Sequence, residues 1–120
     1  MTRAELTHTR DLSFSGWIRE NLPDSSFGFM ATDLDFILYN FQTKKLMLLE
    51  VKTRNAELKQ WQRNLFDNVA KWIAKGIDQD WSFLGFHIIR FEHTFFNDGK
   101  VYLDNELITE EGIRNYLSRI

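Results

Sequence analysis

The chain of 120 residues contains no cysteine and one proline. The absence of cysteine excludes a disulfide framework, a thiolate zinc site and a cysteine nucleophile, and it fits a reducing compartment. No apolar run approaches the roughly 20 residues that a membrane-spanning helix needs. Residues 1–5 are not followed by the apolar segment of a signal peptide. We therefore expect a cytoplasmic protein that does not enter a membrane.

The chain also lacks an excess of positive charge, since its formal net charge is −2 and its pI is near 5.9. Proteins that coat nucleic acid without specificity are usually strongly basic, so the sequence argues against that class. A nuclease is still compatible with this charge, because carboxylates that hold a metal count against the total. Contact with phosphate needs only a local basic patch.

Apolar residues are plentiful, at 43% of the chain, and 15% of the residues are aromatic. This composition is typical of a chain that folds around a core. The length and the absence of repeats or linkers predict a single domain over residues 1–120.

The spacing of apolar residues predicts helices and strands in the order α-ββ-α-ββ-α. The first strand is apolar on both faces, so we expect it to be central in the sheet. The predicted fold class is α/β or α+β, with a mixed central sheet flanked by helices. The predicted helices are residues 11–21, 56–75 and 109–118, and the predicted strands are residues 29–41, 46–52, 81–91 and 101–103. Asp11 or Ser13 is expected to cap the first helix, and Thr109 begins the segment that caps the last.

Charged residues stand at the ends of two apolar strands. Asp33 and Asp35 open the first strand, and Glu50 and Lys52 close the second. Burying an unpaired charge costs several kcal/mol. These side chains therefore need partners or a metal ion.

The pairing of the two strands determines whether these charges meet. If residues 42–45 form the hairpin turn, Asp35 opposes Lys52. Opposed residues share a face of the sheet, as do residues two apart on one strand. The expected one-sided cluster is Asp33, Asp35, Glu50 and Lys52. Clustered carboxylates suit Mg²⁺ or Mn²⁺, which can polarise a phosphate and lower the pKa of bound water.

This arrangement resembles the PD-(D/E)XK nuclease superfamily, which includes restriction endonucleases and Holliday-junction resolvases. The resemblance rests on Asp35, on Glu50-x-Lys52 at a strand end and on the helix that follows, and it covers roughly residues 11–91. It implies a restriction-endonuclease-like fold and Mg²⁺- or Mn²⁺-dependent cleavage of DNA. The proline of the family motif is missing, since Thr32 and Leu34 precede the two aspartates.

The resemblance also implies roles for individual residues. Asp35 and Glu50 would bind the metal, and Lys52 would assist the attacking water. Gln62, on the following helix, matches a further catalytic position, and Glu20 on the first helix matches a further metal ligand. The implied metal site also includes Val51. Asp33 is left with two interpretations, as a second ligand or as a partner of Arg54.

Basic residues beside the motif are candidates for contact with DNA phosphates: Lys44, Arg54, Lys59 and Arg63. A homodimer would help the protein to span duplex DNA. Two alternative hypotheses are a non-catalytic module for nucleic-acid binding or assembly, and a structural protein with incidental ion pairs at its strand ends. Elsewhere, His87, Trp61 and Trp72 are expected to be structural, with both tryptophans in the core.

Overall fold

The computed structural model describes residues 12–120, and the chain divides into two compact units at Thr32. The described part of the first unit contains helix α1 (Ser13–Asn21) and a short 3₁₀ turn, η1 (Ser25–Phe27). Leu12 occupies the N-cap of α1 and its side chain makes no capping hydrogen bond. The expected cap at Ser13 is therefore wrong, because Ser13 is already inside the helix. The other expected cap, Asp11, lies outside the described residues.

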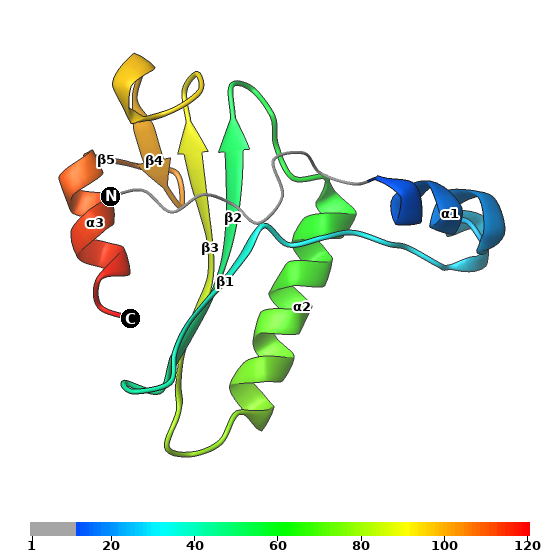
Figure 1. The fold of residues 1–120 in the computed structure, drawn as a ribbon, viewed down its shortest axis with the longest axis horizontal. Coiled ribbons are helices and arrows are strands. Elements are labelled where there is room, and N and C mark those ends of the chain that lie inside the picture. Colours follow the sequence, from blue (N-terminus) through cyan, green and yellow to red (C-terminus); the bar gives the residue numbers. More distant parts are fainter. Residues whose placement is uncertain (1–11) are drawn as a thin grey trace. The chain divides into compact units, whose positions relative to one another are not determined.

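The second unit, Asp33–Ile120, is a five-stranded mixed sheet with two helices (Figure 1). The strands lie in chain order across the sheet, and β2 and β3 are parallel while the other neighbours are antiparallel. The mixed α+β class is confirmed, and β5 was not predicted. The elements are β1 (Phe36–Asn40), β2 (Lys45–Thr53), α2 (Gln60–Gly76), β3 (Ser82–Phe91), the 3₁₀ turn η2 (Phe96–Asp98), β4 (Val101–Leu103), β5 (Glu106–Ile108) and α3 (Glu110–Leu117).

The prediction that the first strand is central is wrong. β1 has five residues and lies at an edge of the sheet. The side chains of Ile37 and Tyr39 are 64% and 60% exposed. The prediction failed because an apolar pattern on both faces of a strand does not reveal how many neighbouring strands it has. The apolar residues before Thr32 belong to the first unit.

The predicted register of the first hairpin is wrong by two residues. Phe36 pairs with Leu49 and Asn40 pairs with Lys45. The Asn40 side-chain oxygen accepts hydrogen bonds from the backbone amides of Gln42 and Thr43. The turn therefore begins one residue earlier than expected. A shift of two residues leaves every side chain on its predicted face. It moves Asp35 from Lys52 toward Glu50.

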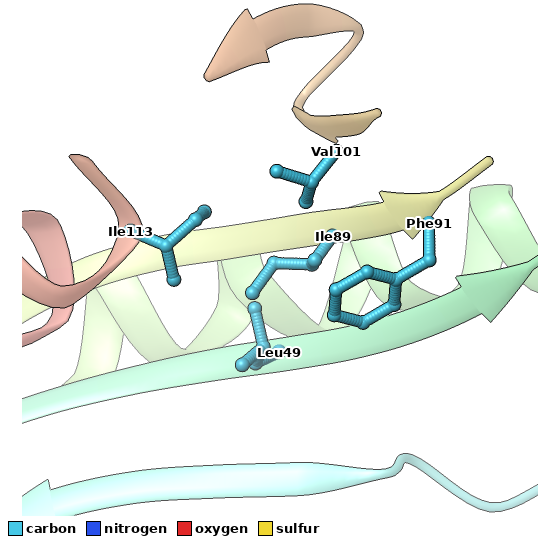
Figure 2. Close-up of a cluster of buried hydrophobic side chains, with 5 residues drawn as sticks. All are labelled: Leu49, Ile89, Phe91, Val101 and Ile113. Atoms are coloured by element: carbon cyan, nitrogen blue, oxygen red, sulfur yellow. The ribbon is translucent and has the colours of Figure 1, made fainter. Parts of the chain in front are cut away.

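The core lies between one face of the sheet and α3 (Figure 2). Ile113 projects from α3 onto the side chains of β2, β3 and β4. Thr109 caps this helix as expected, because its hydroxyl accepts the Gly112 amide at 3.0 Å. The buried cluster consists of Leu49, Ile89, Phe91, Val101 and Ile113.

The opposite face of the sheet carries α2. Phe66 of α2 packs on Phe86 of β3, with ring centroids 5.1 Å apart. Phe86 pairs with Leu48, and the register then runs without interruption to Phe91. Since alternate residues share a face, the charged ends of β2 and β3 lie on the α2 face.

Of the residues expected to be structural, Trp72 is not in the core, whereas His87 connects three elements of the fold. Trp72 is 59% exposed, so its expected core position is wrong, and Trp61 is half-buried. The His87 ring bonds to the Asp104 carboxylate at 2.6 Å and packs edge-on against Tyr116. These contacts connect β3, the β4–β5 turn and α3, which supports a structural role for His87.

Replacing Ile113 by alanine should lower the free energy of unfolding by about 3 kcal/mol, because a buried isoleucine leaves a cavity that the sheet cannot fill. Leu107→Ala is the control, since Leu107 is 66% exposed and should change stability by less than about 0.5 kcal/mol. Urea titration followed by circular dichroism measures both. Equal losses in the two variants would contradict the position assigned to the core.

Candidate functional site

Two hydrogen bonds join Asp35 to the end of β2. The Asp35 amide donates to Glu50 Oε1 at 3.0 Å, and the Val51 amide donates to Asp35 Oδ2 at 2.9 Å. The first bond satisfies a carboxylate oxygen of a residue that is only 3% exposed. The second holds the Asp35 carboxylate against β2. We call this pair of hydrogen bonds the Asp35 clasp.

Lys52 completes the charged group at this strand end. Its Nζ atom lies 3.3 Å from Glu50 Oε2, and both side chains are largely buried. Burial raises the pKa of the Glu50 carboxyl, and its hydrogen bonding with the Asp35 side chain raises it further. The structure therefore brings Asp35, Glu50 and Lys52 together, as the sequence predicted.

Two carboxylates in contact fit a hard divalent cation. Mg²⁺ is commonly held by one or two carboxylates together with waters and substrate phosphate. A cation would favour the ionised form of Glu50, which its surroundings disfavour. Within residues 12–120, no three His, Cys, Asp or Glu side chains form a metal-binding group. The carboxylate donors are thus those of Asp35 and Glu50, and the backbone of Val51 lies beside them, since its amide bonds to Asp35.

Three further predicted site residues, Asp33, Gln62 and Glu20, lie at separate places in the chain. Asp33 is exposed and precedes β1, and the Asp35 clasp favours Asp35 as the ligand. The Gln62 side chain accepts the Lys59 amide at 3.1 Å, so it helps to begin α2. Glu20 belongs to α1, in the first unit, and its metal role stays a prediction.

The predicted phosphate-binding residues are spread along the second unit. Arg54 directly follows β2, where its amide donates to the carbonyls of Phe91 and His93. Arg63 lies over the Phe86 ring, 6.0 Å from its centroid, on the same face as Lys52. Lys59 is the N-cap of α2.

Lys44 is not brought to the carboxylates. It lies in the β1–β2 turn, at the opposite end of β2 from Glu50, and its Nζ atom bonds to Asp80 at 2.6 Å. Lys44 precedes Glu50 by six positions along the chain, which in an extended strand is a span of about 20 Å. Its predicted phosphate contact therefore belongs to a different part of the surface.

One charged residue at this end of the sheet was missed. Arg90 pairs with Lys52 across the parallel strands β2 and β3. A lone arginine near the end of an apolar strand is the same type of anomaly as Glu50. The sequence contained that indication, but the parallel register that aligns Arg90 with Lys52 could not be deduced from it.

A cavity of about 670 Å³ lies on the α3 face of the sheet. Its walls are mainly apolar, with Phe36, Phe96 and Leu117 among them, and Asp35 also lines it. Glu50 and Lys52 project from the α2 face, so Asp35 is the one member of the charged cluster that also lines the cavity.

Comparison with known proteins leaves the family open. No protein-family model matches the chain, and no solved structure matches it significantly. The chain is similar to an uncharacterized protein of Archaeoglobus fulgidus, with 30% identity over 95 residues. The match covers 78% of this chain and 62% of that protein, which is less than two thirds of its length. In residues 12–120, no helix is both long and apolar enough to cross a membrane.

In metal-free buffer, Glu50→Gln should stabilise the protein at pH 8 relative to wild type. The stability contributed by protonated Glu50 is fully present below the unfolded-state pKa of about 4.3. It is lost as the pH rises through the raised folded-state pKa. The glutamine stays neutral at every pH. The difference in the free energy of unfolding between the variant and the wild type, measured by urea titration, should therefore increase from pH 4 to pH 8. Glu111→Gln, at an exposed residue, is the control, and an unchanging gap for Glu50→Gln would contradict the raised pKa.

Proposed function

We propose that the protein is a metal-dependent nuclease that hydrolyses phosphodiester bonds in DNA. The observation that supports this most is the contact of Asp35 and Lys52 with one buried carboxylate, Glu50. The resemblance of this motif to the PD-(D/E)XK superfamily points the same way. No membrane-spanning helix occurs in the part of the chain that the structure describes, and the proposal needs none.

The residues would divide the chemistry between them. Asp35, Glu50 and the Val51 backbone oxygen would hold Mg²⁺ or Mn²⁺, which when bound supplies Lewis acidity toward phosphate and water. The Lys52 ammonium donates hydrogen bonds to the attacking water and to a phosphate oxygen, where it stabilises developing negative charge. The water oxygen bonds to phosphorus as one ester P–O bond breaks. The electron pair of that bond goes to the leaving oxygen, which takes up a proton equivalent to the one that the water loses. The products are a phosphomonoester and a hydroxyl.

The proposed substrate is DNA, cut at an end or at a structural feature and not at a particular sequence. The site lies at one end of a single small sheet, and the second unit has no separate element for reading bases. A homodimer is proposed as the form that would engage both strands of a duplex.

Lys52→Ala should reduce Mg²⁺-dependent DNA cleavage by at least about 100-fold, because it removes the donor that orients water and stabilises charge. Glu50→Ala should abolish cleavage. Lys71→Ala is the matched control, since Lys71 is exposed on α2. Linear, circular, single-stranded and branched DNA are incubated with Mg²⁺, Mn²⁺ or EDTA. A folded Lys52→Ala protein that cuts at the wild-type rate would exclude this mechanism.

One observation favours a second candidate function. Only two carboxylates meet at the site, and among residues 12–120 no third His, Cys, Asp or Glu completes a metal-binding group. A fold of this type without catalysis would serve as a nucleic-acid-binding or assembly module. Metal binding separates the two functions.

Calorimetric titration of the wild type with Mn²⁺ should give binding in the millimolar range or tighter. Asp35→Asn should weaken it, because the amide keeps an oxygen for the Val51 amide but removes a charged ligand. Glu111→Gln should bind like the wild type. No binding at millimolar Mn²⁺ would favour the non-catalytic module.

A further inference from the structure

Two cationic side chains lie side by side at the ends of β2 and β3. Lys52 and Arg90 are register partners, on strands about 4.8 Å apart. Like charges on paired residues repel each other. Lys52 has Glu50 as a close partner, so Arg90 is the less well neutralised member of the pair.

Among residues 12–120, Arg90 has one side-chain polar contact, and it is long. Its Nη1 atom lies 3.4 Å from Glu57 Oε1, and the Glu57 side chain is 70% exposed. Arg90 Nε is buried and has no hydrogen-bond partner among the described residues. A guanidinium has five donors in a planar fork, and the contact with Glu57 involves only Nη1 of Arg90. Unsatisfied buried donors are rare in native structures and call for an explanation.

We propose that Arg90 binds a backbone phosphate of the nucleic-acid substrate, beside the phosphate that Lys52 contacts. This inference rests on the proposed function and names an anion site on β3 that the sequence motif does not include. A guanidinium fork matches two phosphate oxygens. The Arg90 side chain is 30% exposed, so part of it is reachable from solvent even though Nε is buried.

Glu57 occupies the place of the phosphate in the free protein. It lies in the loop between β2 and α2, and its exposed carboxylate can leave Arg90 at little cost. Substrate binding exchanges the carboxylate for a phosphate and releases Glu57 to solvent. Glu57 therefore competes with the substrate.

The test measures binding of a fluorescein-labelled DNA duplex by anisotropy, with Ca²⁺ in place of Mg²⁺, over a series of salt concentrations. Arg90→Gln should weaken binding roughly 10-fold and reduce the slope of log K against log salt by about one. Arg114→Gln is the matched control, because Arg114 is paired with Glu110 on α3, across the sheet. It should keep the wild-type slope.

Glu57→Gln supplies the opposite prediction. It should tighten DNA binding several-fold relative to Glu111→Gln, which removes the same charge from exposed α3. A merely structural role for the Arg90–Glu57 pair predicts no such gain. This variant also decides the question if circular dichroism shows that Arg90→Gln does not fold.

The outcomes separate this inference from the nuclease proposal. If Arg90→Gln binds like Arg114→Gln and Glu57→Gln binds like Glu111→Gln, the Arg90 proposal is overturned, whether or not Mg²⁺ supports cleavage. A wild type that does not bind DNA overturns it too. If the Arg90 and Glu57 effects are found but Mg²⁺ produces no cleavage, the Arg90 site stands and the nuclease proposal fails.

Discussion

The Asp35 clasp joins the start of β1 to the end of β2, and the geometry of the candidate site depends on it. The amide and the carboxylate of Asp35 are both engaged, with Glu50 and Val51 respectively. Rotation of the Asp35 side chain would leave the Val51 amide without this acceptor, and loss of the residue would leave a buried Glu50 oxygen without its donor. Unpaired buried polar groups cost about 1–3 kcal/mol each. The backbone at this strand end is thus coupled to the positions of two carboxylates.

The same contacts make the site electrostatically unfavourable without a cation. Glu50 is buried beside a second carboxylate, and Lys52 offsets this only in part, because the net effect is still a raised Glu50 pKa. A site of this kind stabilises the protein less than an apolar residue of similar volume would. Ligand binding therefore explains this buried carboxylate pair better than stability does. The electrostatics of Glu50 thus support a metal site independently of the family resemblance.

The sequence predicted some elements well and others poorly, for identifiable reasons. Strand β3 and helix α3 were found because they have β-rich composition and a Thr109 cap, which are local properties. Strand β5 was missed because it has three residues, although the Asp104–Asn105 turn, with φ of 50° and 70°, has residues that suit a two-residue hairpin. The sequence correctly predicted that Asp35 and Glu50 lie in one cluster, but it predicted the wrong register for the two strands. The register depended on Asn40, whose side chain starts the turn early.

The position of Arg90 depends on a backbone irregularity near the other end of its strand. Between the pairs Leu46–Phe83 and Leu48–Phe86, β3 contains one extra residue. Gly85 lies in this bulge with φ of 93°, which strains any residue with a side chain. Without the extra residue, every later side chain of β3 would exchange faces, and Lys52 would be paired with Ile89. The bulge therefore determines that a second cation lies beside Lys52 on the α2 face. Since a bulge cannot be located from alternation in one strand alone, the cationic pair became visible only in the folded chain.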